Sequence, residues 1–160
     1  TLWAETVNGH YLLDIFKDRV RYPDLKKTIK QKFEDRPADE LIIEDKSSGI
    51  ALIEDLQDST QLPIIAFDPG MSDKVDRLTV VSPYFETRNV FFWQGCPYLQ
   101  ECINELIGFK GKGSVTHDDF VDNVSMYLLR VGEGANLGFS KQSLNDINKE
   151  EADTLQEKEW

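Results

Sequence analysis

Three aspartates within five residues open the last strongly helical segment of the chain. They are Asp118, Asp119 and Asp122, and His117 directly precedes them. Carboxylates a few ångströms apart repel one another, so that one pKa must rise unless a cation neutralises the charge. Hard divalent cations such as Mg²⁺ prefer oxygen ligands of this kind. The cluster therefore predicts a divalent-metal site, and such sites commonly serve phosphodiester hydrolysis.

A second acidic position, Glu44, ends the apolar run 41–43, the most apolar strand candidate in the chain. Such a run is expected of a central strand covered on both faces. Ligands of open α/β sheets bind beyond the carboxyl ends of the strands, where Glu44 lies. Asp45 alternates to the opposite face and is not expected to point toward the same metal ion. A metal site forms if the fold brings Glu44 against the acidic helix start.

A simpler explanation of the three aspartates stays open. Acidic side chains at a helix N-terminus stabilise the helix dipole while remaining solvated. Thr116, with Asp119 three residues later, also resembles a capping box. At 100° per residue the aspartates fall within an arc of about 100°, opposite the apolar face. That apolar face comprises Phe120, Val124, Tyr127, Leu128 and Val131.

Four basic residues are candidates for contacts with a nucleic-acid backbone: Lys46, Lys74, Arg77 and Lys112. Lys74 and Arg77 lie three residues apart on one helical face, where they could instead form surface ion pairs with Asp73 and Asp76. The glycine-rich loop at 110–113 lacks the Walker pattern of a phosphate-binding loop. It remains a plausible basic contact for phosphates beside the acidic helix.

Periodicity predicts the elements that must position these residues. Strands are expected at 1–5, 11–16, 41–43, 62–67 and 90–93, and helices at 22–35, 49–56, 72–81, 97–109 and 118–131. The first two strands should form a hairpin, because Asn8-Gly9 between them is a strong turn signal. A hairpin that leads into alternating helices and strands predicts an α/β fold, with a mixed sheet and helices on both faces.

Composition sets the broad class. The chain has 160 residues, 40% of them apolar, and a formal net charge of −11. We expect one domain over 1–132 and a polar, acidic tail over 133–160. The charge argues against a broad basic surface for nucleic acid but leaves room for a local basic groove.

Two cysteines are too few for a zinc site and favour a reducing compartment. No apolar run approaches about 18 residues, so a cytoplasmic protein without membrane spans is expected.

Five segments occur in an order and spacing typical of one family. They are YLLD at 11–14, YPDL at 22–25, IIEDKSSG at 42–49, DKVDR at 73–77 and HDDFVD at 117–122. Over residues 3–130 the chain resembles the C-terminal nuclease domain of the large terminase subunit of tailed bacteriophages or prophages. The resemblance implies an RNase H-like fold and a Mg²⁺- or Mn²⁺-dependent endonuclease that cuts concatemeric double-stranded DNA in the bacterial host cytoplasm. It also implies the portal protein, the small terminase subunit and further copies of the chain as partners.

The resemblance implies that Glu44, Asp118 and Asp119 hold two metal ions, with Asp122 also following the family pattern. The family's first strand, which carries a further aspartate, is expected upstream of Thr1, as is the ATPase that drives packaging. A chain without that strand should hold an incomplete site, cut weakly or not at all, and associate with itself through exposed backbone groups. Two alternatives stay open: a non-catalytic docking module of the packaging motor, and another RNase H-like nuclease such as a resolvase or transposase.

Overall fold

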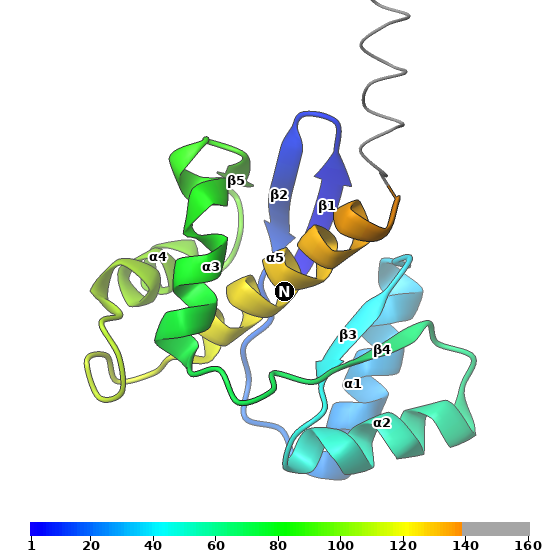
Figure 1. Ribbon diagram of the computed structural model, residues 1–160. Helices are drawn as coiled ribbons and strands as arrows, with labels where there is room; N and C mark the ends of the chain where they lie inside the picture. Colours follow the sequence, from blue (N-terminus) through cyan, green and yellow to red (C-terminus); the bar gives the residue numbers. More distant parts are fainter. Residues whose placement is uncertain (139–160) are drawn as a thin grey trace, which may run out of the picture.

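The computed structural model describes the backbone of residues 1–138 and the side chains through residue 132 (Figure 1). The strands are β1 (Leu2–Thr6), β2 (Gly9–Asp14), β3 (Leu41–Glu44), β4 (Ile64–Phe67) and β5 (Val90–Phe92). The helices are α1 (Tyr22–Asp35), α2 (Ser48–Ser59), α3 (Lys74–Glu86), α4 (Leu99–Gly108) and α5 (Asp119–Gly138). All the predicted elements are present. The predicted tail beyond residue 138 lies outside the described residues.

The predicted hairpin joins β1 and β2. The two strands pair antiparallel, with Thr6 opposite Gly9. Gly9 has a φ of 127°, and a Cβ atom there would lie 2.5 Å from the backbone oxygen of Asn89. Glycine is therefore required at this position both by the turn and by the close approach of the chain that leads into β5.

The strands form two separate sheets in the described part of the chain. In the first, β2 pairs antiparallel with β1 and parallel with β5, which makes a mixed sheet. In the second, β3 pairs only with β4, in parallel. The prediction that β3 is a central strand covered on both faces is wrong for these residues, because all four of its residues are only half-buried. Its other edge has no strand partner among the described residues, and neither does the outer edge of β1.

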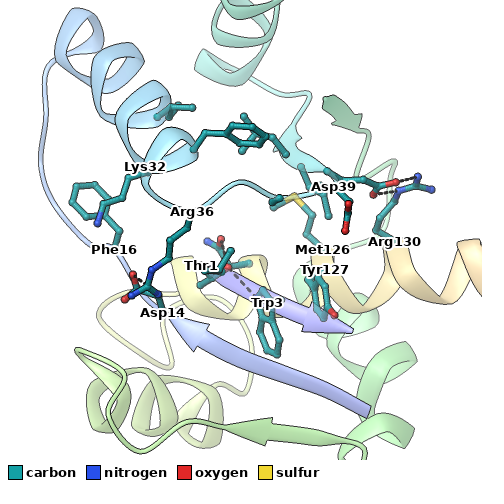
Figure 2. Close-up of a pocket in the computed structure, with 18 of the residues that line it drawn as sticks. Thr1, Trp3, Asp14, Phe16, Lys32, Arg36, Asp39, Met126, Tyr127 and Arg130 are labelled. Atoms are coloured by element: carbon teal, nitrogen blue, oxygen red, sulfur yellow. Dashed lines mark hydrogen bonds and ion pairs between the residues drawn. The ribbon is translucent and has the colours of Figure 1, made fainter. Parts of the chain in front are cut away.

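A cavity of about 750 Å³ lies between these two open strand edges (Figure 2). Leu2 and Trp3 line it from β1, and Leu41 and Ile42 line it from β3. Helices α1 and α5 line it with apolar side chains, among them Leu25, Ile29 and Met126, and also with charged ones, among them Lys32 and Arg130. The space separating the two sheets is thus lined by both apolar and charged side chains and is bounded on two sides by open strand edges.

The long helix α5 connects the two sheets through its side chains. Tyr127 stacks on Trp3 of β1 with ring centroids 4.5 Å apart, and Arg130 donates to Glu40, just before β3, at 2.6 Å. The predicted apolar face is confirmed, since Phe120, Val124 and Leu128 are buried and the half-buried Tyr127 and Val131 pack against the core. Val121 and Ser125 are fully buried as well, so α3 and α4 cover more of the helix than its apolar stripe indicates. None of the described helices is long and apolar enough to cross a membrane.

The start of α5 is capped from another helix. The carboxylate of Glu105 in α4 accepts hydrogen bonds from the backbone nitrogens of Phe120, at 2.6 Å, and Val121, at 3.1 Å. The predicted capping box with Thr116 is therefore wrong. A buried carboxylate at this point satisfies two of the amide groups that every helix N-terminus leaves free. It also fixes the first turn of α5, where the acidic residues lie.

Candidate functional site

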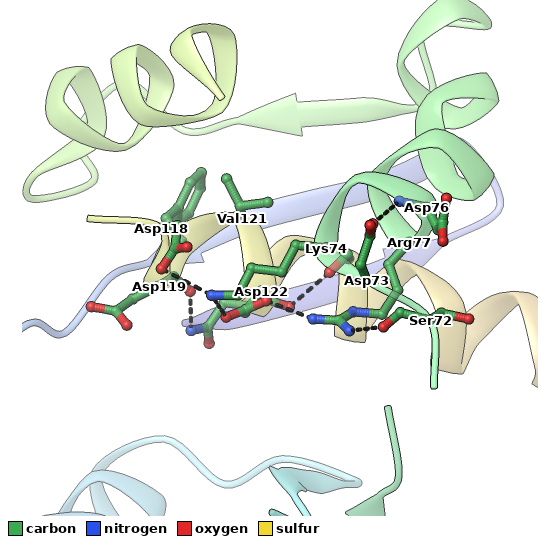
Figure 3. Close-up of polar contacts among 12 residues, drawn as sticks. Ser72, Asp73, Lys74, Asp76, Arg77, Asp118, Asp119, Val121 and Asp122 are labelled. Atoms are coloured by element: carbon green, nitrogen blue, oxygen red, sulfur yellow. Dashed lines mark hydrogen bonds and ion pairs between the residues drawn. The ribbon is translucent and has the colours of Figure 1, made fainter. Parts of the chain in front are cut away.

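The three aspartates lie at the start of α5 but differ in their surroundings. Asp119 is exposed, and no described residue forms a hydrogen bond or ion pair with its carboxylate. Asp118 and Asp122 are half-buried and face α3 (Figure 3). The predicted acidic cluster therefore divides into one free carboxylate and two that already have partners.

Lys74 and Arg77 of α3 are those partners. The ammonium nitrogen Nζ of Lys74 lies 2.9 Å from Oδ1 of Asp118 and 2.5 Å from Oδ2 of Asp122. Nη2 of Arg77 lies 2.7 Å from Oδ1 of Asp122. Burial by itself lowers the pKa of Lys74, but the hydrogen bonds that its ammonium group donates to Asp122 and Asp118 outweigh burial and raise the pKa above its usual value. We call these four side chains the ion-pair cluster.

The predicted surface pairs of Lys74 and Arg77 with Asp73 and Asp76 do not form. Asp73 instead caps α3, since its carboxylate accepts a hydrogen bond of 2.8 Å from the backbone nitrogen of Asp76. This cap orients the first turn of α3 so that both basic side chains reach α5. The DKVDR segment therefore builds a helix start that supplies two cations to the acidic helix.

Arg77 holds the start of α3 against α5. Its side chain is only 9% exposed, and its second terminal nitrogen donates to the backbone oxygen of Ser72 at 2.9 Å. A guanidinium group this deeply buried requires partners that satisfy its charge and its donors. Asp122 supplies the charge, so this aspartate has a structural role beside any role in metal binding.

Replacement of Arg77 by methionine is expected to destabilise the fold by about 1–3 kcal/mol, because a buried charge-assisted hydrogen bond is lost. Asp122 keeps Lys74 as a partner. The loss of stability should therefore be smaller than the loss caused by leaving a buried charge without any partner. Urea denaturation followed by circular dichroism measures the change. Arg21→Met is the matched control: Arg21 is exposed and pairs with Asp24 at 3.3 Å, so no measurable change is expected. Equal effects of the two substitutions would contradict this role of Arg77.

Glu44 lies at the carboxyl end of β3, as predicted, and is half-buried. No described residue bonds or pairs with its carboxylate. The chain turns sharply after it: a Cβ atom on Gly49 would lie 1.9 Å from the backbone oxygen of Glu44. The glycine in IIEDKSSG is thus needed for α2 to begin directly beside the end of β3. Asp45 is exposed.

The remaining basic candidates, Lys46 and Lys112, are exposed and have no carboxylate partner among the described side chains. Lys112 lies between Gly111 and Gly113, whose φ angles of 118° and 81° give the loop a path that other residues rarely follow. Both lysines are free to meet an anionic ligand, whereas Lys74 and Arg77 are engaged in the ion-pair cluster.

The fit of these residues to a divalent cation is partial. Free carboxylates such as those of Glu44 and Asp119 have the oxygen chemistry that Mg²⁺ and Mn²⁺ prefer. However, no three histidine, cysteine, aspartate or glutamate side chains of the described region lie close enough together to hold a metal ion. The structure brings Asp118 and Asp122 together on Lys74 and does not bring Glu44 into a three-ligand group with them. The donor types fit, and the arrangement is incomplete.

Sequence reasoning did not single out Glu105, although it fixes the start of the acidic helix. Glu105 is buried and lies three residues after the buried Cys102, on the same face of α4. A charged residue on an otherwise apolar helical face is the signal that could have identified it, since buried carboxylates need partners. Glu105 positions the backbone from which Asp118, Asp119 and Asp122 project.

Other groups with reactive chemistry are not arranged as a nucleophilic site. His10 is buried, and its Nδ1 lies 3.1 Å from the hydroxyl of Tyr127; burial lowers the pKa of His10. Both cysteines are free and buried, and burial raises the pKa of Cys102 to about 11, which disfavours the reactive thiolate. His117 is exposed. The carboxylates thus remain the best candidates for chemistry in the described residues.

Comparison with known families finds a match over most of the chain. The family described as Terminase RNaseH-like domain matches residues 2–130, nearly the same range as the resemblance found in the sequence. No curated protein and no solved structure matches the chain. The match covers both β3 with Glu44 and the start of α5 with the three aspartates.

Proposed function

Because the chain belongs to the Terminase RNaseH-like domain family, we propose that it is the nuclease domain of a large terminase subunit, which cuts concatemeric double-stranded viral DNA during packaging. The family match over residues 2–130 carries this proposal. The placement of carboxylates at the end of β3 and at the start of α5 supports it. The proposed setting is the cytoplasm of an infected bacterium, with the portal protein and the small terminase subunit as partners and further copies of the chain in the motor.

We propose that Glu44, Asp118 and Asp119 hold the metal ions of a two-metal site, with Asp122 beside them. When bound, Mg²⁺ or Mn²⁺ would supply an activated water and stabilisation of the leaving oxygen. Lys46 and Lys112, which are exposed, are the stronger candidates for DNA-backbone contacts; Lys74 and Arg77 are weaker ones, because carboxylates already hold them. Phosphate contacts carry no base information, so little sequence specificity is expected.

The cavity between β1 and β3 supports the further proposal of one additional strand in the complete domain. A strand placed there would pair with both open edges and join the two sheets. The apolar side chains from α1 and α5 would cover it. A carboxylate on such a strand could complete the ligand set that Glu44 and the α5 aspartates leave incomplete. This strand is predicted in the sequence upstream of Thr1.

Hydrogen exchange tests the proposed strand. In a protein extended upstream of Thr1 by about thirty residues, enough for one strand and its connection, the backbone amides on the open edges of β1 and β3 should become strongly protected. The amides of β4, on the far side of β3, serve as the internal control and should change little. Unchanged exchange at β1 and β3 in the extended protein would contradict the proposal.

DNA cleavage tests the proposed function. We expect the upstream-extended protein to nick and linearise plasmid DNA in Mg²⁺ or Mn²⁺ and to lose this activity in EDTA. The 160-residue chain should cut weakly or not at all. Cleavage that persists in EDTA would rule out the proposed mechanism. Absence of cleavage by the extended protein in either metal would count against the nuclease assignment.

Two observations favour the second candidate, a non-catalytic docking module within the same motor. Asp118 and Asp122 are already neutralised by Lys74 and Arg77, and a net charge of −11 offers an acidic surface for a protein partner. A docking module would bind the portal protein with or without divalent metal. It would leave plasmid DNA intact in the extended form, which separates the two candidates.

A further inference from the structure

Lys74 bridges two carboxylates that the proposed function assigns to the metal site. Its ammonium nitrogen lies 2.9 Å from Asp118 and 2.5 Å from Asp122, and Figure 3 shows it reaching from α3 across to the start of α5. An ammonium ion in this position uses the same carboxylate oxygens that a divalent cation would use.

The charges of the ion-pair cluster balance. Asp118 and Asp122 contribute two negative charges, and Lys74 and Arg77 contribute two positive charges. A second cation that approaches Asp118 meets the repulsion of the ammonium group a few ångströms away. A metal ion therefore gains the full attraction of Asp118 only after the Lys74 side chain has left.

The two basic residues differ in their freedom to leave. The side chain of Lys74 is 34% exposed and reaches solvent, whereas that of Arg77 is 9% exposed and is also bound to the backbone of Ser72. A lysine side chain is flexible and can place its head group in water while its stem stays in contact with the protein. Lys74 is thus the movable cation, and Arg77 is the fixed one that retains Asp122.

We propose that Lys74 is a built-in counter-ion that competes with divalent metal for Asp118 and keeps this ligand out of the metal site until its side chain swings away. The inference rests on the proposed nuclease function and adds to it a control of metal affinity. Asp122, held by Arg77, remains the structural anchor of the cluster when Lys74 departs.

Calorimetric titration of the upstream-extended protein, in which the proposed ligand set is complete, with Mn²⁺ alone tests this competition. Lys74→Met should tighten Mn²⁺ binding by about tenfold or more, since the competing charge is gone, and Asp118→Asn in the same protein should reverse the gain. Lys74→Arg keeps the charge and should bind as weakly as the native chain. Lys26→Met is the matched control, because Lys26 is 32% exposed and pairs with Asp55 at 2.8 Å away from the site.

Chemical modification of lysines gives a second test. If Lys74 had only a structural role, its acetylation rate would not depend on Mn²⁺. Mn²⁺ should increase the acetylation rate of Lys74 in the native chain, as the amine leaves its carboxylate partners. The rate at Lys26, with similar exposure and one carboxylate partner, should stay constant.

The inference is overturned if Lys74→Met binds Mn²⁺ no more tightly than the native chain, which includes the case in which neither protein binds it. An acetylation rate at Lys74 that does not respond to Mn²⁺ also overturns it. The nuclease assignment fails separately, through absent cleavage by the upstream-extended protein. The two failures are therefore distinguishable.

Discussion

Replacement of Asp119 by asparagine is expected to reduce metal-dependent DNA cleavage by the upstream-extended protein by about a hundredfold or more, because the metal ion that would stabilise the developing charge loses a ligand. The substitution removes the negative charge of the one α5 aspartate whose carboxylate has no partner among the described residues. The free energy of unfolding should fall by no more than about 1 kcal/mol, because only the interaction of Asp119 with the α5 helix dipole is lost. Plasmid nicking in Mn²⁺ and urea denaturation measure the two quantities.

Asp58→Asn provides the control for this experiment. Asp58 is also exposed and lies near the end of α2, without a described partner. Its substitution should leave both cleavage and stability unchanged. Full cleavage activity in the Asp119→Asn protein would remove this residue from the proposed metal site. A large loss of stability would instead show that Asp119 holds the fold.

Replacement of Glu105 by alanine is expected to destabilise the protein by about 2–3 kcal/mol. The backbone amides of Phe120 and Val121 lose a charged acceptor in a buried place, and the start of α5 loses a negative charge that its dipole favours. Urea denaturation followed by circular dichroism measures the loss. The first turn of α5 should also exchange its amide hydrogens faster, because its cap is gone.

Two substitutions in the same helix calibrate this result. Glu105→Gln keeps an acceptor oxygen and should recover part of the stability. Glu101→Ala removes an exposed glutamate that pairs with Lys17, and such surface pairs contribute little. If Glu105→Ala destabilises no more than Glu101→Ala, the capping role assigned to Glu105 is wrong.

Local patterns were sufficient to predict the elements that carry the site. Asn8-Gly9 predicts the hairpin because Asn-Gly is a strong turn signal, and Gly9 has a positive φ that few other residues adopt. The apolar run ending at Glu44 predicts β3, and the spacing of Phe120, Val124 and Leu128 predicts the buried face of α5. Each of these signals depends on residues close in sequence, and each is confirmed.

Contacts between distant elements were not predictable in the same way. Lys74 was expected to meet phosphates or Asp73 and Asp76, but the packing of α3 against α5 turns it toward Asp118 and Asp122. The cap of α5 comes from Glu105, fifteen residues before Phe120, so no capping motif at the helix start could reveal it. The prediction that β3 is a central strand was wrong, because an apolar sequence does not reveal how many strands pair with it.

We propose that Glu44 and the aspartates at the start of α5 act on one shared metal site in the complete domain. Crystals of the upstream-extended protein soaked in Mn²⁺ test this most directly, because anomalous scattering locates the ion. We expect Mn²⁺ bound by the carboxylates of Glu44 and Asp119, with Asp118 released from Lys74. Mn²⁺ bound elsewhere, or a Glu44 side chain directed away from Asp118 and Asp119 with no ion between them, would contradict the account.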